Sequence, residues 1–187
     1  VCPLDITRKI FGPDLLIWMD TIKKSRFKDT NKIFSPPSKF DLRITEKNAD
    51  LYTLVISDKI KKYKWNGKKP TGQMLGRFQP WHDGHKKLFE TILLKVAQIN
   101  IQVRNVQGIG DNPFKFSSIK KMINKSLKNY AARYQITLMP NISNIFYGRT
   151  VGYKIEKINL NKSIQNISGT KIRKKLRLKG KLKFIND

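Results

Sequence analysis

In the second part of the chain, short apolar segments of strand length alternate with segments of helical periodicity. Strands are expected at 73–78, 99–103 and 136–139. Apolar residues at helical spacing predict helices over 88–96 and, from a Ser-Ser cap, over 117–134. Strands that alternate with helices are typical of an α/β domain with a parallel sheet.

The chain is expected to divide near residue 70, after a Gly- and Pro-containing stretch. Residues 71–187 would form the main domain, with further strands at 145–147 and 155–160. Residues 1–70 carry strand-like runs at 15–19 and 40–44, followed by helical spacing between Leu51 and Ile60. We therefore expect a small N-terminal α/β appendage in front of the main domain.

Charge is the outstanding feature of the composition. The 187 residues include 39 Lys and Arg against 13 Asp and Glu, a net charge of +26. A positive surface of this kind has three interpretations: a solvated face, a nucleic-acid face, or a field that attracts small anionic substrates. Because 39% of the residues are hydrophobic, the chain can bury a core and is not a disordered polybasic tail.

Several classes of protein are excluded or disfavoured by simple features. No apolar run reaches the ~18 residues that a membrane-spanning helix needs, and the first residues do not form a signal peptide. The single Cys2 excludes an internal disulfide and a cysteine zinc site. We expect a cytoplasmic protein, and the start without Met indicates either an artificial boundary of the sequence or the remnant of a longer polypeptide.

The two histidines of the chain lie three residues apart, within the segment 76–85. At the start of a helix this spacing places His82 and His85 on one face, and the free amides of the first turn attract an anion. Gly84 between them would let a ligand approach the backbone. The alternatives are half of a metal site and two unrelated surface histidines.

A second segment, 167–173, is also expected where a strand leads into a helix. Ser168 and Thr170 are residues that begin helices, and Arg173 follows one turn later. A guanidinium beside free helix amides suits phosphate. Taken alone, the segment is interpreted as an ordinary helix cap.

Together the two segments resemble the HxGH nucleotidyltransferase superfamily. Residues 76–85 give Gly-Arg-Phe-Gln-Pro-Trp-His-Asp-Gly-His, and residues 167–173 give Ile-Ser-Gly-Thr-Lys-Ile-Arg. The first motif most resembles that of archaeal nicotinamide mononucleotide (NMN) adenylyltransferases. The resemblance covers about residues 71–178 and implies a Rossmann-like parallel sheet.

The resemblance also implies a reaction. A nucleotidyl group, AMP from ATP or else CMP from CTP, would pass to a phosphate- or hydroxyl-bearing acceptor with Mg²⁺ and release of pyrophosphate. Catalysis would fall to His82, His85 and Arg173. Nucleotide binding would fall to seven residues: Gly76, Arg77, Phe78, Gly84, Ser168, Gly169 and Thr170. No metal ligand from the chain is expected.

The small anionic acceptor is not identified by the sequence. Asn112 begins an Asn-Pro-Phe stretch that is similar to one beside the substrate pocket of archaeal NMN adenylyltransferases, although it is equally an ordinary turn. Arg104, Tyr147 and Arg149 are further candidates for binding an anion.

Residues 1–60 resemble the C-terminal part of adenylylsulfate-kinase-like P-loop proteins. They contain no Gly-x₄-Gly-Lys-Ser/Thr loop, so they cannot act as a kinase alone. A fused or associated P-loop kinase is therefore a candidate partner, as is a second copy of the chain. The alternative function is a catalytically silent module, either nucleic-acid-binding or accessory to a sulfate-activation kinase.

Overall fold

The computed structural model describes residues 4–23, 25–61, 63–108, 110–146, 148–149 and 152–182. The chain forms two compact units, Val1–Lys62 and Tyr63–Asp187. The segment 63–70 thus lies with the second unit, whereas the sequence placed the division near residue 70.

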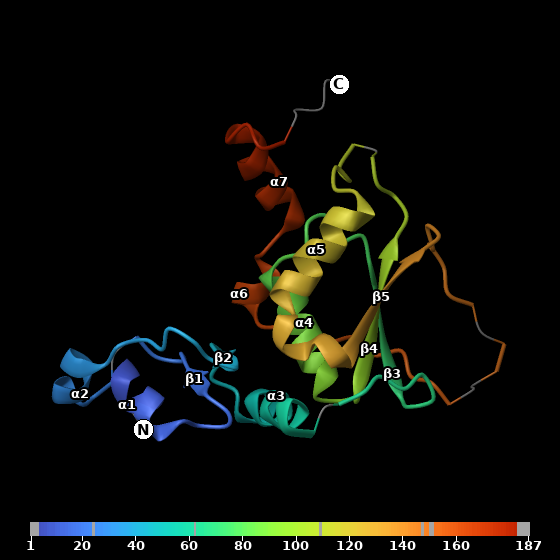
Figure 1. The fold of residues 1–187 in the computed structure, drawn as a ribbon. Coiled ribbons are helices and arrows are strands. Elements are labelled where there is room, and N and C mark those ends of the chain that lie inside the picture. Colours follow the sequence, from blue (N-terminus) through green and yellow to red (C-terminus); the bar gives the residue numbers. More distant parts are fainter. Residues whose placement is uncertain are drawn as a thin grey trace. The chain divides into compact units, whose positions relative to one another are not determined.

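Within its described residues, the first unit contains a two-stranded parallel sheet and three helices (Figure 1). Strands β1 (Ile17–Met19) and β2 (Leu42–Ile44) pair in parallel, and α3 (Ala49–Lys61) follows β2. These three elements match the expected appendage. The sequence did not predict α1 (Asp5–Phe11) or α2 (Lys28–Ile33).

Polar contacts explain why α1 forms without a strong apolar pattern. The buried Arg8 guanidinium donates to Asp5 Oδ1 at 3.0 Å and to the Ser35 carbonyl at 2.6 Å. The helix ends at Gly12, whose φ of 58° is the left-handed conformation that glycine adopts at little cost.

The second unit is built on a three-stranded parallel sheet of order β3-β4-β5. The strands are β3 (Thr71–Gly76), β4 (Gln98–Arg104) and β5 (Tyr134–Met139). The central β4 is the most buried, because it has a neighbour on each side and Ile99, Ile101 and Val103 are fully covered. The predicted α/β class with a parallel sheet is confirmed.

The crossover helices lie on the same side of this sheet (Figure 1). Helix α4 (Asp83–Leu93) links β3 to β4, and α5 (Phe116–Ser126) with the 3₁₀ helix η1 (Lys128–Arg133) links β4 to β5. Phe89 of α4 and Ile119 and Ile123 of α5 are fully buried. Helix α5 starts at Phe116, so the expected Ser117-Ser118 cap lies inside its first turn.

Gln98 holds the segment before β3 against the sheet. Its fully buried amide donates to the Asn66 carbonyl at 2.6 Å and to Thr71 Oγ1 at 2.8 Å. Its oxygen accepts from Tyr63 Oη and from the Asn66 amide, both at 3.2 Å. The side chain therefore satisfies backbone groups that would otherwise lack partners at the start of the domain.

The strands expected at 145–147 and 155–160 are wrong for the residues that the structure describes. Residues 141–146 and 153–160 form neither helix nor strand, and Tyr147 lies outside the described residues. Phe146 and Ile155 are 89% and 68% exposed. Their apolar side chains meet no partner surface, so the burial that would stabilise a strand is missing.

The chain continues into α6 (Lys162–Gln165) and α7 (Gly169–Leu178) (Figure 1). Among the residues described, no helix combines the length and the apolar character needed to cross a bilayer.

Candidate functional site

The first motif connects the end of β3 to the start of α4. Strand β3 stops at Gly76, and His82 is the N-cap of α4 with an extended backbone. Because the three strands are parallel, this loop lies at the edge where all three carboxyl ends meet. In open α/β sheets ligands bind at this edge.

The two imidazoles lie face to face, as their spacing predicted. The ring centroids of His82 and His85 are 3.8 Å apart, and the ring planes differ by 23°. Nδ1 of His85 accepts from the His82 backbone N–H at 3.3 Å. A neutral imidazole whose Nδ1 accepts carries its proton on Nε2, so His85 has an N–H to donate to a ligand.

Burial keeps both rings neutral. It lowers the pKa of His85 to about 3, with a smaller contribution from the neighbouring His82. Burial also lowers the pKa of His82, and the Asp83 carboxylate offsets part of that effect. At neutral pH the pair therefore acts as neutral hydrogen-bonding groups.

Phe78 packs against an imidazole, and two glycines leave room for the rings beside them. The Phe78 ring is 3% exposed and meets the His85 ring edge-on at 5.0 Å. A Cβ on Gly76 would lie 2.8 Å from the Phe78 ring, and a Cβ on Gly84 would lie 3.0 Å from the His82 ring. Gly84 thus makes room for a histidine of this chain, whereas we had expected it to admit a ligand.

The second motif forms the start of α7. Ser168 is the N-cap, and its side chain makes no capping hydrogen bond. The sequence predicted this position as a helix start. Among the described residues no side chain accepts from the amides of the first turn, so these amides are available to an anion.

Arg173 joins the second motif to the first. Only 4% of the residue is exposed. Its guanidinium donates to the Gln79 carbonyl at 2.6 Å and to Thr170 Oγ1 at 3.1 Å, and it pairs with Asp111 at 3.0 Å. Its Nε is buried and has no hydrogen-bond partner within the described parts of the chain.

Gln79 is a site residue that sequence reasoning missed. Its buried side chain donates to the Phe114 carbonyl and accepts from the Phe114 amide, both at 2.9 Å. The Gln79 carbonyl also accepts a hydrogen bond from Arg173. These contacts connect the first motif to two other segments. The available signal was an amide inside an otherwise apolar stretch of the motif, flanked by Phe78 and Pro80.

One cavity of about 260 Å³ lies between the two motifs. It is lined by Arg77, Gln79, Pro80, His82, His85, Ser168, Gly169, Thr170 and Arg173. All of these except Gln79 and Pro80 are among the ten residues predicted for catalysis and nucleotide binding. The other three predicted residues, Gly76, Phe78 and Gly84, are not in the lining. With two arginines and no acidic side chain, the lining is suited to an anion.

The residues predicted for the acceptor do not line this cavity. Asn112 accepts from Arg77, a cavity residue, at 3.5 Å. Arg104, at the end of β4, donates to Asn141 Oδ1 at 2.6 Å. Arg149 is exposed, and Tyr147 lies outside the described residues.

A protein-only metal site is not formed by the part of the chain that the structure describes. No group of three His, Cys, Asp or Glu residues occurs there. The carboxylate in contact with a cavity residue is that of Asp111, and it is paired with Arg173.

The chain is similar in sequence to archaeal enzymes. The nicotinamide-nucleotide adenylyltransferases of Methanococcus aeolicus and Methanococcus maripaludis are each 28% identical to the chain over 130 residues. The overlap covers 55% of this chain and 75% of each relative. No protein-family model matches the chain, and no solved structure matches it significantly.

Proposed function

We propose that the chain, which is similar to two nicotinamide-nucleotide adenylyltransferases, is a nucleotidyltransferase of the HxGH type that transfers AMP from ATP to a phosphate- or hydroxyl-bearing acceptor. The observation that carries this proposal is the cavity between the two motifs. The motifs lie more than 80 residues apart in the sequence, and a role in structure alone would not require both to face one anion-binding space.

The cavity suits the phosphates of a nucleotide. Its volume of about 260 Å³ is below the ~300–1,000 Å³ of a pocket that encloses a whole drug-sized ligand. The amides at the start of α7, the Thr170 hydroxyl and the Arg173 guanidinium supply donors for the β- and γ-phosphates. His82 and His85 supply neutral donors for the α-phosphate.

In the proposed reaction an acceptor oxygen attacks the α-phosphorus and forms a new P–O bond. The bond from the α-phosphorus to the bridging oxygen breaks, and its electron pair leaves on pyrophosphate. Negative charge grows on the oxygens that are transferred and released, so hydrogen-bond donors fixed in place stabilise the transition state. No covalent intermediate with the protein is formed.

Magnesium enters this proposal as part of the Mg–ATP substrate. The chain offers no cluster of carboxylates for it among the described residues, and Mg²⁺ commonly binds through substrate phosphates. The ion would neutralise charge on the leaving pyrophosphate.

NMN is the first acceptor to test, because both similar enzymes are named for it. Arg77 and Asn112, which contact each other beside the cavity, are the described residues best placed to meet an acceptor phosphate. CTP is the alternative nucleotide. The proposal further includes a cytoplasmic location, a P-loop kinase as partner and a homo-oligomer.

The test is pyrophosphate release from Mg–ATP in the presence of NMN. His82→Ala is expected to lower kcat by about 10²–10³, with a much smaller change in ATP affinity, because the imidazole acts on the transition state. Lys87→Ala, at a half-buried position of the same helix outside the cavity lining, is the control and should retain activity. Equal losses of kcat and ATP affinity would contradict the catalytic role of His82.

A further inference from the structure

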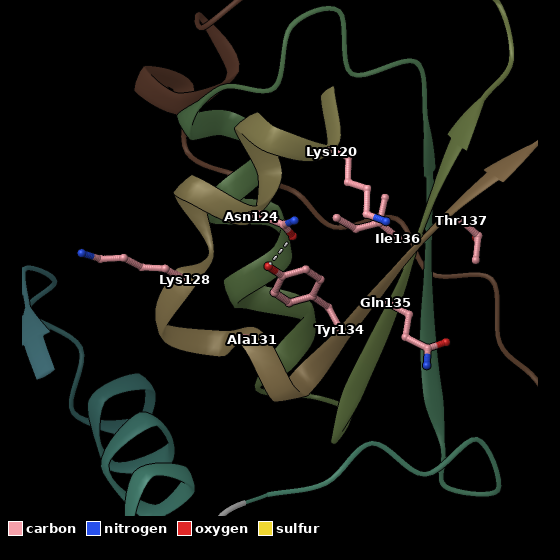
Figure 2. A pocket seen from close by; sticks show the side chains of 8 residues that line it. All are labelled: Lys120, Asn124, Lys128, Ala131, Tyr134, Gln135, Ile136 and Thr137. Atoms are coloured by element: carbon pink, nitrogen blue, oxygen red, sulfur yellow. Dashed lines mark hydrogen bonds between the residues drawn. The ribbon is translucent and has the colours of Figure 1, made fainter. Parts of the chain in front are cut away.

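A second cavity, of about 590 Å³, runs along the outer strand of the main sheet (Figure 2). Strand β5 pairs with β4 on one side, and on its other side no described strand pairs with it. The cavity touches four consecutive residues of β5, 134–137, together with residues of α5 and η1.

The four consecutive residues locate this cavity at the edge of the sheet. Side chains of a strand alternate between the two faces, and Figure 2 shows Tyr134 and Ile136 on the side of α5 while Gln135 and Thr137 point the other way. The cavity lies beside β5, whose outer edge pairs with no described strand. An unpaired edge presents N–H donors and C=O acceptors that another strand can use.

The charge around this groove is of one sign. Lys120 and Lys128 line it and are exposed. The sequence from 112 to 155 contains six Lys, two Arg and no Asp or Glu. A negatively charged partner is therefore favoured, and pairing of two copies is disfavoured because each copy brings the same lysines and a net charge of +26.

We propose that the β5 groove binds an acidic, extended peptide segment, which adds to β5 as a further strand. Backbone hydrogen bonds to the open edge would supply affinity, and carboxylates facing Lys120 and Lys128 would supply the preference for an acidic sequence. The occupant is a protein partner of the domain, distinct from the nucleotide.

The groove favours a peptide over single-stranded nucleic acid for two reasons. Phosphates accept hydrogen bonds but do not donate, so they match only half of a strand edge. The aromatic side chain in the lining is also engaged, because the Tyr134 ring packs on Phe89 at 5.8 Å and its hydroxyl donates to Asn124 Oδ1 at 3.0 Å. Tyr134 is thus not free to stack on a base.

The experiment measures fluorescence anisotropy of a labelled (Glu-Val)₅ peptide with the full chain at about 0.15 M salt, where charges beyond ~8 Å are screened. A second peptide of the same sequence carries N-methyl groups on alternate amides, which removes strand donors and keeps the charge. If the peptide pairs with β5 through its backbone, N-methylation weakens binding at least about tenfold.

Charge variants on α5 and η1 provide the matched control. The double variant K120E/K128E is expected to weaken binding of (Glu-Val)₅ at least about tenfold. The double variant K121E/K125E changes the same net charge on α5 outside the groove lining and should change binding less than about threefold. Circular dichroism checks that both variants remain folded.

Three results would overturn the proposal. The N-methylated peptide could bind as tightly as the unmodified one, which would show attraction by charge alone. The two double variants could weaken binding equally. Finally, a ten-residue oligouridylate could bind more tightly than (Glu-Val)₅ and displace it, which would assign the groove to nucleic acid.

Discussion

At the residue scale, Gln79 holds three segments of the site together, a role that its place in the sequence did not indicate. Its side chain and carbonyl contact Phe114 and Arg173, so one residue fixes the distance between three segments. A buried amide with every group paired is favourable only while its partners stay in place.

Gln79→Ala should therefore destabilise the protein. It would leave the Phe114 N–H and C=O without their partner, at a cost of about 1–3 kcal/mol in the free energy of unfolding. Urea denaturation measures this change. Gln73→Ala removes an exposed glutamine of the adjoining strand and should lower the free energy of unfolding by less than about 0.5 kcal/mol. An equal loss in the two variants would show that the buried contacts of Gln79 do not stabilise the protein.

His85 should make stability depend on pH. Its pKa is about 3 in the folded chain and about 6.5 when unfolded, so between these values the unfolded chain binds more protons. The free energy of unfolding therefore falls as the pH drops below ~6.5, and His85 contributes up to about 1.4 kcal/mol per pH unit to this fall. Above pH ~6.5 the titration of His85 does not change the free energy of unfolding.

His85→Asn removes the titrating ring. Urea titrations between pH 4 and 6.5 should show a shallower loss of stability for this variant than for the unaltered protein. His82, whose pKa burial also lowers, keeps part of the slope. The same slope in both proteins would mean that His85 is not held neutral by burial.

At the scale of elements, the start of α7 depends on a close backbone approach. A Cβ on Gly169 would lie 2.9 Å from the Gln79 carbonyl oxygen and 3.3 Å from the Arg173 guanidinium. Any larger residue must move the helix away from the first motif. The glycine of the second motif thus sets the width of the cavity.

Gly169→Ala is expected to cost about 1–3 kcal/mol of stability through this overlap and to lower kcat/KM at least about tenfold by displacing the phosphate-binding turn. Gly67→Ala is the control, because its Cβ would meet nothing within 4 Å. Thermal unfolding and pyrophosphate release measure the two effects. An unchanged Gly169→Ala enzyme would refute the close approach.

Segments that pair with a neighbouring strand were predictable, and segments that stay exposed were not. The expected run at 99–103 corresponds to β4, whose Ile99, Ile101 and Val103 are fully buried. The run at 136–139 corresponds to β5, which pairs with β4 although its own residues are half-buried or exposed. The runs near Phe146 and Ile155 have similar composition but remain exposed. Composition indicates which segment can become a strand, whereas a neighbouring strand decides whether it does.

At the scale of the whole molecule, the candidate site is formed by two motifs that are distant in sequence and meet in the fold. The sequence predicted that the imidazoles and the Ser168–Thr170 segment would meet, and both line one cavity. It could not predict that Gln79 and Asp111 would hold Arg173 between them. Such contacts depend on loop geometry, which no local pattern encodes.

The central claim is that the start of α7 holds the phosphates of a nucleotide bound at the first motif. Its most direct test is the affinity of Thr170→Val for Mg–ATP and for AMP, measured by isothermal titration calorimetry. Thr91→Val, a substitution of the same kind on α4 outside the cavity lining, is the control.

Thr170→Val should weaken ATP binding about tenfold or more, since a hydrogen bond to a charged group contributes about 1.5–3 kcal/mol. AMP has no β- and γ-phosphates, so its affinity should barely change. Equal losses for ATP and AMP, or no loss for either, would contradict the claim.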